Sequence, residues 1–318
     1  NAFIAYLQGV HRVAEFRRLE AIFSLLSIVS SLLLLVFDGK ILSLVIVSQF
    51  WAVLSVLRNR SLCLKFDQNI FINRKKFKFY KEIFDKIWPS SWRSGLGVLM
   101  SYGIVQSSTL VFAQSDDVGM VSSYLFSMRI MQIILNFCQA PFYSKIPQMS
   151  TFYAKGEYEK IKEVAKRGMG LSFLSYFLCW VIIYFFANPI LALLGSNITF
   201  IPSLLWTLMG FSYFIERYGA MHIQLYTLTD DVIWHISNGI SGTIYVLLIF
   251  LFYSKLGVYV FPLSMIISYC LFYSWFNAYK SYSVFKMNFL KFEITSSLPF
   301  LLLFIVFIAI DFYKLYIK

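Results

Sequence analysis

Residues 127–147 read SMRIMQIILNFCQAPFYSKIP, and this stretch carries most of the information about the fold. Its long aliphatic side chains suit the interior of a membrane, yet an arginine and three amides interrupt them. The polar positions recur every three or four residues, which predicts one polar face on an α-helix. They are Arg129, Gln132, Asn136 and Gln139, followed by Tyr143. The opposite face is predicted to be apolar, with Ile130, Met131, Ile134 and Phe137.

The whole chain shares this apolar character. Of its 318 residues, 59% are hydrophobic and 14% are charged, and its mean hydropathy is +0.69. A soluble domain is about half apolar and about a quarter charged. Continuous apolar runs of about 20 residues span a bilayer as helices, whereas membrane barrels show short alternating strands. We therefore predict an all-α polytopic membrane protein.

Nine segments are apolar enough to be candidate spans. They lie at 20–37, 42–57, 92–113, 120–143, 170–187, 201–226, 232–253, 257–279 and 295–313. The sixth is the least typical, because it contains Glu216 and Arg217. We expect a helical bundle of about nine transmembrane helices.

The 28 lysines and arginines are distributed unevenly over the two sides that these spans define. Loops on one side carry 22 of them, loops on the other carry four, and Arg129 and Arg217 lie within spans. Basic loops stay in the cytoplasm, so this asymmetry orients the chain. It also explains the net charge of +12 without nucleic acid, which we do not expect as a partner.

Two basic segments are predicted to lie at the cytoplasmic surface. Residues 58–91 are expected to form a linker on the anionic headgroups of membrane lipids, or alternatively a docking site for a partner or for a lipid head. In residues 155–167, Tyr158, Ile161 and Ala165 share one helical face among charges. That pattern predicts a short amphipathic helix at the membrane interface.

The sequence shows no motif for catalysis, for a cofactor or for a metal. Its four cysteines include no CxxC pair, its three histidines are scattered, and it has no nucleotide-binding loop. The outward loops are too short to hold an extracytoplasmic catalytic domain. We therefore expect a transporter, not an enzyme, with no cofactor.

The polar face at 129–143 needs a polar environment. An arginine at bilayer depth costs about 2.5–3.5 kcal/mol, a cost that falls if it faces a bundle interior or a wet cavity. Its planar guanidinium suits phosphate and carboxylate groups. Weaker polar stripes in three other spans favour a shared, water-accessible cavity. They are Ser94, Ser101 and Ser108; Glu216, Arg217 and Gln224; and His235, Asn238, Gly242 and Tyr245.

Each stripe also has a plainer explanation. Interhelical hydrogen bonds hold membrane bundles together and contribute roughly 0.6 kcal/mol each on average. Glu216 and Arg217 are adjacent, so a local ion pair is the alternative to a role in binding.

Residues 88–163 resemble the hairpin that opens the second lobe of the polysaccharide (O-antigen type) flippases. These belong to the multidrug/oligosaccharidyl-lipid/polysaccharide exporter superfamily. The resemblance rests on Trp88-Pro89, Gln106-Ser107, the acidic turn Asp116-Asp117 before Gly119, Pro141, Lys145-Ile146-Pro147 and the stretch 155–158. Residues 7–22, LQGVHRVAEFRRLEAI, are similar to the junction between the fourth and fifth spans of that family.

The resemblance implies a two-lobed exporter whose first lobe is incomplete in this chain. Residues 1–57 would be the remnant of that lobe, 58–91 the basic cytoplasmic linker, and 92–318 the second lobe. The family's N-terminal spans are then expected to be missing.

The resemblance further implies that the protein translocates a lipid-linked oligosaccharide of the undecaprenyl-diphosphate type. The setting would be the cytoplasmic (inner) membrane, in the biosynthesis of surface polysaccharide such as the O-antigen of lipopolysaccharide, with other polysaccharide-assembly proteins as possible partners. Arg129 and Arg217, with Glu216 beside them, would hold the diphosphate or an acidic sugar. Gln132, Asn136 and Gln139 would bond sugar hydroxyls.

Three other functions remain open. A cation-coupled multidrug exporter of the same superfamily would use intramembrane carboxylates, and Glu216 is the acid that we assign within a span. A membrane-embedded glycan polymerase or ligase is the second alternative, and the short outward loops count against it. The third is a membrane subunit that does not transport by itself, or a degenerate remnant of a transporter.

Overall fold

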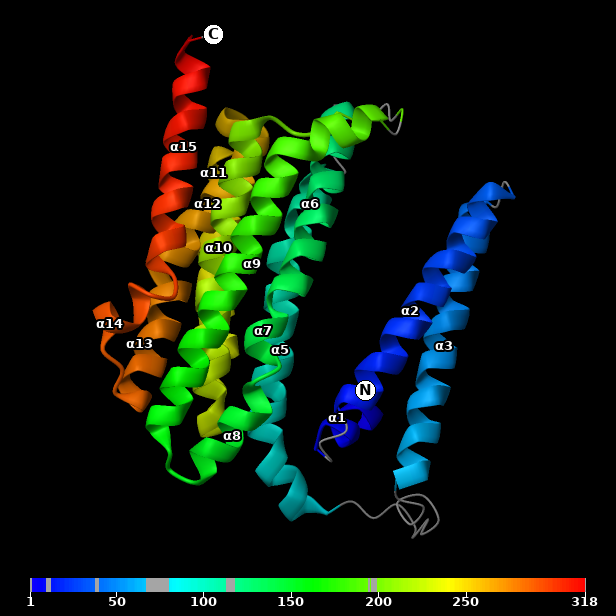
Figure 1. Ribbon diagram of the computed structural model, residues 1–318, viewed down its shortest axis with the longest axis vertical. Helices are drawn as coiled ribbons and strands as arrows, with labels where there is room; N and C mark the ends of the chain where they lie inside the picture. The colour runs from blue at the N-terminus through cyan, green and yellow to red at the C-terminus, as the bar shows by residue number, and fades with distance from the viewer. Residues whose placement is uncertain are drawn as a thin grey trace. The chain divides into compact units, whose positions relative to one another are not determined.

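A computed structural model describes residues 2–9, 13–37, 40–66, 80–112, 118–193, 195 and 199–317. Among these residues the regular structure is helical throughout and includes no strand (Figure 1). The all-α prediction is therefore confirmed for the described part of the chain. The chain divides into two compact units, Asn1–Lys81 and Glu82–Lys318.

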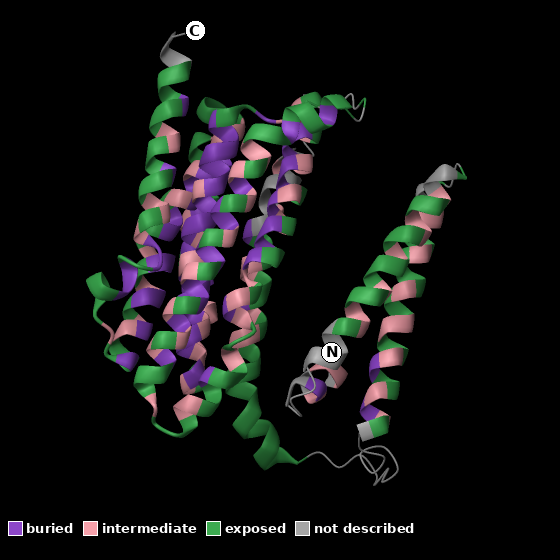
Figure 2. Ribbon diagram, viewed as in Figure 1, coloured by how far each residue is buried: buried purple, intermediate pink, exposed green. Residues whose placement is uncertain are grey.

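The first unit is built on two long helices, α2 (Val13–Val36) and α3 (Ile41–Phe66), with the short α1 (Ala2–Gly9) against α3. Trp51 on α3 joins the two long helices, because its Nε1 donates to Ser30 Oγ at 2.8 Å. Its ring also meets Phe23 edge-on at 5.7 Å. Most other side chains described on these helices are exposed or half-buried (Figure 2). Because few of its described side chains are buried and many apolar ones are exposed, this unit suits a lipid environment.

The second unit contains the other helices of the described residues. They are α5 (Lys81–Phe112), α6 (Val118–Cys138), α7 (Ala140–Tyr143), α8 (Ile146–Ala154), α9 (Tyr158–Leu193), α10 (Ser203–Tyr226), α11 (Trp234–Leu256), α12 (Val260–Ser268), α13 (Ser274–Phe285), α14 (Phe289–Glu293) and α15 (Leu298–Ile317). A π-helical turn, Tyr269–Tyr273, joins α12 to α13.

Helix α10 lies at the centre of the second unit and packs against α9, α12, α13 and α15. Most of its residues are buried. Glycines permit two close approaches: a Cβ at Gly210 would lie 2.1 Å from Trp180 Nε1, and one at Gly219 would lie 2.5 Å from the Tyr273 ring. The least typical predicted span is thus the most enclosed helix. Because protein surrounds it, it does not need an apolar surface on every side.

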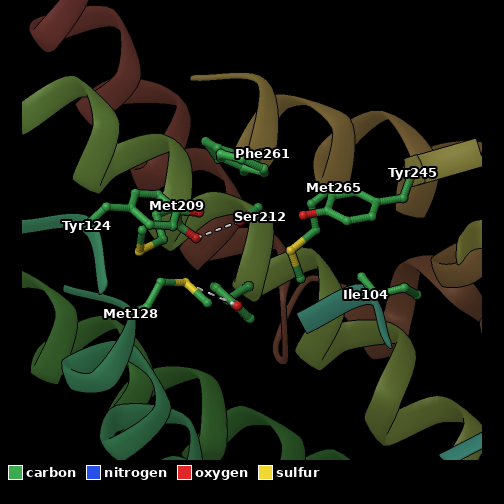
Figure 3. A pocket seen from close by; sticks show the side chains of 10 residues that line it. Ile104, Tyr124, Met128, Met209, Ser212, Tyr245, Phe261 and Met265 are labelled. Carbon is green, nitrogen blue, oxygen red and sulfur yellow. Dashed lines mark hydrogen bonds between the residues drawn. The ribbon is translucent and has the colours of Figure 1, made fainter. Parts of the chain in front are cut away.

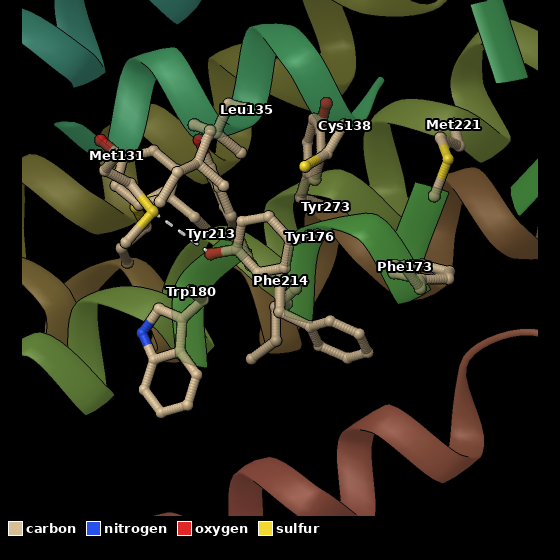
Figure 4. Close-up of a cluster of buried hydrophobic side chains, with 14 of the residues drawn as sticks. Met131, Leu135, Cys138, Phe173, Tyr176, Trp180, Tyr213, Phe214, Met221 and Tyr273 are labelled. Atoms are coloured by element: carbon tan, nitrogen blue, oxygen red, sulfur yellow. Dashed lines mark hydrogen bonds between the residues drawn. The ribbon is translucent and has the colours of Figure 1, made fainter. Parts of the chain in front are cut away.

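Large side chains from α6, α9 and α10 form the core around this central helix (Figure 4). Tyr176 on α9 donates through its hydroxyl to the Gly210 carbonyl at 2.8 Å. Trp180 and Trp206 donate to each other's backbone carbonyls at 3.3 and 3.4 Å. Buried polar atoms are therefore hydrogen-bonded across the α9–α10 contact, as buried polar groups in stable folds usually are.

Four stretches of the described residues are long and apolar enough to cross a membrane. They are Leu42–Lys65, Gly119–Ala154, Tyr158–Leu193 and Trp234–Phe285. They indicate a membrane protein. Every one of the nine predicted ranges overlaps a helix, but the count of nine spans and the two-lobed architecture stay predictions.

The two basic segments are more helical than expected. Helix α3 continues to Phe66 and α5 begins at Lys81, so both ends of the predicted linker 58–91 are helical, and residues 67–79 lie outside the described part. The prediction of a separate short helix at 155–167 is wrong. After a turn at Gly156, with φ of +73°, the chain enters α9 at Tyr158 and runs unbroken into the apolar part. Ile161 and Ala165 are buried because they pack on neighbouring helices of the unit.

Candidate functional site

The polar face predicted on α6 exists and lies at the surface of the second unit. Arg129 and Asn136 are exposed, while Gln132 and Gln139 are half-buried. Arg129 Nη1 donates to Gln132 Oε1 at 3.3 Å, and Gln139 Nε2 donates to Asn136 Oδ1 at 3.5 Å. The recorded hydrogen bonds of Arg129, Gln132 and Asn136 thus stay within this stripe. We call the four residues the α6 stripe.

The rest of α6 divides differently from the prediction. Met131, Ile134, Leu135 and Cys138 are buried in the core. Phe137, predicted on the same apolar face, is instead 66% exposed. Successive residues of a helix are about 100° apart, so Phe137 lies beside Asn136 and not opposite it. The exposed surface of α6 is therefore half polar and half apolar.

One end of the α6 stripe meets an ion pair from α10. Arg217 Nε and Nη2 donate to the two carboxylate oxygens of Glu216 at 2.8 and 2.7 Å. Arg217 Nη1 donates to Gln139 Oε1 at 2.9 Å, which joins residues 78 positions apart in the sequence. Both side chains of the pair are largely buried. The local ion pair considered from the sequence is confirmed.

This arrangement gives the two arginines different chemical roles. The guanidinium of Arg217 is neutralised by Glu216 and held by Gln139, so it has little capacity left for a further anion. Arg129 has no carboxylate within ion-pair distance among the described residues. Of the two, Arg129 is the better-placed group to bind a phosphate or a carboxylate.

The polar stripe predicted on α11 serves a different purpose. Asn238 is buried, and its Nδ2 donates to the backbone carbonyl of Gly97 on α5 at 3.0 Å. The His235 ring packs on Trp92 of α5 at 5.2 Å, and Gly242 faces Ile104. The α11 stripe therefore joins two helices, as its plainer explanation held. That it shares a water-accessible cavity with the α6 stripe stays a prediction, and Tyr245, the last residue of the α11 stripe, lines a small void beside α6.

A void of about 10 Å³ is enclosed among α5, α6, α10, α11 and α12 (Figure 3). Tyr124 and Met128 line it from α6, and Met209, Ser212 and Tyr213 line it from α10. A space this small holds at most about one water. No residue of the α6 stripe borders it, so it has no part in binding a headgroup.

Asp311, an acid within the ninth predicted span, was not among the site residues predicted from the sequence. Asp311 on α15 is buried, and it accepts bonds of 2.6 Å from Tyr184 on α9 and from Thr207 on α10. A carboxylate in an otherwise apolar run was the available signal. Its partners come from distant segments, so their identity was not readable. Asp311 links three helices.

The most highly connected buried acid was not anticipated either. Glu293 on α14 accepts hydrogen bonds from Tyr218 at 3.1 Å and from Ser296 at 3.0 Å, and further bonds from Tyr282 and Ser297. His222 Nε2 lies 3.4 Å from the same carboxylate, and its Nδ1 contacts Ser281. We call this group the Glu293 cluster.

The environment of Glu293, which lies between two predicted spans, shifts its pKa. Burial acts to raise the pKa, but His222, Ser297 and Tyr282 outweigh burial and lower it to about 2. The carboxylate is therefore ionised at neutral pH and fully engaged by donors. In sequence, this acid in a short loop resembled an ordinary solvated residue, and only packing against α10 and α13 distinguishes it.

Comparison of the chain with protein-family models, with curated proteins and with solved structures gives no match.

Proposed function

We propose that this protein translocates a lipid-linked oligosaccharide across a cytoplasmic membrane and that the α6 stripe handles its charged, polar head. The observation that carries the proposal is that Arg129 and Asn136 are exposed and Gln132 is half-buried on a helix that belongs to a membrane-length stretch. Their recorded bonds do not hold the second unit together. Interhelical bonding within this unit therefore does not account for them.

The physical argument starts from the cost of the arginine. Arg129 is the twelfth of the 21 residues of α6, so it lies near the middle of a helix about 30 Å long. Lipid contact at that depth would cost about 2.5–3.5 kcal/mol. The proposal places the α6 stripe against a wet cavity, and alternating access carries the head from one face of the membrane to the other.

The stripe supplies complementary chemistry for such a substrate. Arg129 would bind the diphosphate or an acidic sugar, since a guanidinium presents paired donors to oxyanions. The amides of Gln132, Asn136 and Gln139 would exchange hydrogen bonds with sugar hydroxyls. Arg217 and Glu216 would fix Gln139 in position. The lipid tail would lie along apolar neighbours such as Phe137.

Under this proposal the protein is multi-pass in the inner membrane, and its basic loops face the cytoplasm. Membrane lipids surround it, and its substrate is of the undecaprenyl-diphosphate type. Its product would be a surface glycan such as O-antigen, assembled with other polysaccharide-assembly proteins.

The test is surface display of glycan in a host whose own flippase is deleted. The gene that encodes this chain is compared with its Arg129→Ala variant at matched membrane expression. The control is Arg167→Ala, which removes an exposed arginine whose surface ion pair with Glu163 contributes little to stability. We expect the parent and the control to restore display and Arg129→Ala to lose it. Equal display from all three would show that the stripe does not handle the substrate.

The cation-coupled drug exporter needs an intramembrane carboxylate that is accessible to a cation. Glu216 is bound bidentately by Arg217, and Asp311 is buried under Tyr184 and Thr207. Both carboxylate oxygens of each acid already accept hydrogen bonds from the protein, so neither acid is free to bind a cation. The flippase therefore remains the better-supported proposal. Drug resistance conferred by the parent, with no glycan display, would reverse that order.

A further inference from the structure

A second polar surface lies at the end of the second unit where α9 begins. A groove of about 570 Å³ separates the first turns of α9 from the connection between α13 and α14 and from α14 itself. Its lining is rich in lysine: Lys160, Lys162, Lys166, Lys286 and Lys291. Two acids, Glu159 and Glu163, also line it. We call this feature the lysine groove.

The acids in the lysine groove are already neutralised. Glu159 pairs with Lys162 at 2.6 Å, and Glu163 pairs with Arg167, outside the lining, at 2.9 Å. Lys160 pairs with Glu157 at 3.0 Å. Lys166, Lys286 and Lys291 have no carboxylate within ion-pair distance among the described residues. The ammonium groups of these three lysines, one from α9 and two from the segment 286–291, thus border the same groove, and none of them is paired with a described carboxylate.

The backbone that presents these lysines is held in an unusual shape. Lys286 has φ of +48°, a left-handed conformation that a lysine rarely adopts. It is one of two non-glycine residues with positive φ in the described part, and Asp230 is the other. Helices commonly end on a residue in this conformation, so it fixes where α13 ends and the connection to α14 begins.

Lys286 takes this shape as the cap that ends α13, because its backbone N–H donates to the Tyr282 carbonyl. The connection that follows is packed on the Glu293 cluster. Glu293 at the end of α14 accepts bonds from Tyr282 on α13 and from Tyr218 on α10, which holds the connection against the core. Asn288 caps α14 by accepting from the Lys291 backbone N–H at 3.1 Å. Phe292, buried, closes the groove from behind. Lys286 and Lys291 therefore belong to a segment that is packed against the core.

We propose that the lysine groove binds the phosphate group of an anionic membrane lipid. Lysine ammonium groups bind phosphate as point charges, and the positive end of the α9 dipole adds to the attraction. Met287 and Phe292 supply an apolar side for the part of the lipid next to the phosphate.

Position favours a lipid over a soluble anion. Helix α9 is one of the membrane-length helices, and its charged part ends at Arg167, directly before the apolar stretch that begins at Met169. Lys166 is therefore about 5 Å along the axis from the apolar part, at the depth of the headgroups. This inference does not rest on the proposed function, because Arg129 is not part of the groove.

The experiment uses the full chain in a neutral detergent and measures its thermal unfolding temperature. Dioctanoyl phosphatidylglycerol is titrated in, with dioctanoyl phosphatidylcholine and inorganic phosphate as separate arms. The groove variant is Lys286→Gln with Lys291→Gln. The matched control is Lys145→Gln with Lys155→Gln, which removes two exposed lysines from the same predicted side of the membrane and changes the net charge equally.

We expect phosphatidylglycerol, and neither other additive, to raise the unfolding temperature of the parent. The concentration at half-maximal shift should rise about tenfold in the groove variant and stay unchanged in the control. An equal weakening in both variants would mean diffuse attraction to a basic face and would overturn the proposal. A similar shift with inorganic phosphate would overturn the assignment to a lipid. If the double variant does not fold, the single change Lys166→Gln is read by the same criteria.

Discussion

The α6 stripe and the Glu293 cluster are both polar groups in a mainly apolar protein, but they are built in opposite ways. Glu293 is 4% exposed, and side chains from α10, α13 and the residues after α14 supply its donors. Arg129 and Asn136 are exposed, and their recorded bonds run only to other stripe residues.

The difference distinguishes polar groups that stabilise the fold from polar groups that are available to bind a substrate. A buried charge is stable only when its surroundings satisfy it, so the Glu293 cluster reports on how the unit is held together. Gln139 bonds to Arg217, but the unit does not use Arg129, Gln132 and Asn136 for its own packing, so these three have to meet something else. This contrast makes the stripe the candidate for substrate and the cluster a part of the scaffold, and four predictions test it.

The largest effect is expected at the cluster. Glu293→Ala would leave the hydroxyl donors of Tyr218, Tyr282 and Ser297 without the carboxylate that accepts their hydrogen bonds. Breaking a buried charged network costs about 3–5 kcal/mol. Thermal or denaturant unfolding of the purified protein measures the loss. A variant as stable as the parent would show that the Glu293 cluster, like the α6 stripe, does not stabilise the fold.

The second effect is a pH dependence of stability that arises from the same residue. The pKa of Glu293 is lowered to about 2 in the folded state, below its value of 4.5 in an unfolded chain. The folded state therefore binds this proton less readily, and the stabilisation is present above about pH 4.5 and is lost as the pH falls toward about 2. Glu293→Gln should flatten this part of the stability profile, between about pH 4.5 and 2. Parallel profiles for parent and variant would contradict the prediction.

A smaller effect is expected at the α5–α11 contact. Asn238→Leu removes one interhelical hydrogen bond, to the Gly97 carbonyl, which keeps its bond within α5. Such bonds contribute about 0.6–1.7 kcal/mol in membrane bundles. The unfolding free energy should fall by about 1 kcal/mol. A loss as large as that of Glu293→Ala would show that this stripe does more than join two helices.

The smallest effect on stability is expected at the α6 stripe. Arg129→Gln and Asn136→Leu change exposed side chains whose recorded bonds are local, so each should alter the unfolding free energy by less than about 0.5 kcal/mol. The measurement is the same unfolding experiment, with Asn238→Leu as the reference for a packed polar residue. A loss above about 2 kcal/mol at Arg129 would place the stripe among the structural groups.

Part of this picture was readable from the sequence. The spacing of Arg129, Gln132, Asn136 and Gln139 fixed their common face, because helical periodicity depends only on residues close in sequence. The same periodicity was misapplied to Phe137, which lies beside the stripe. Glu216 and Arg217 are adjacent, so their pairing was also a local property.

Other features depended on contacts between distant segments. Gln139 meets Arg217 across 78 positions, and Tyr218 reaches Glu293 across 75. Asn238 and Asn136 are both amides on apolar helices, yet one is buried against α5 and the other is exposed. The residues around them in sequence do not predict which amide is buried, because burial depends on whether a neighbouring helix covers that face.

The sequence by itself determined that this protein is helical and rich in membrane-length apolar stretches, and that one helix carries a cationic stripe. Composition and periodicity act over a few helical turns, so these properties need no knowledge of the fold. Only the tertiary structure decided which polar groups are satisfied. It enclosed α10, neutralised Arg217, buried Glu293 among its donors and left Arg129 exposed, since burial and hydrogen bonding depend on segments that folding brings together.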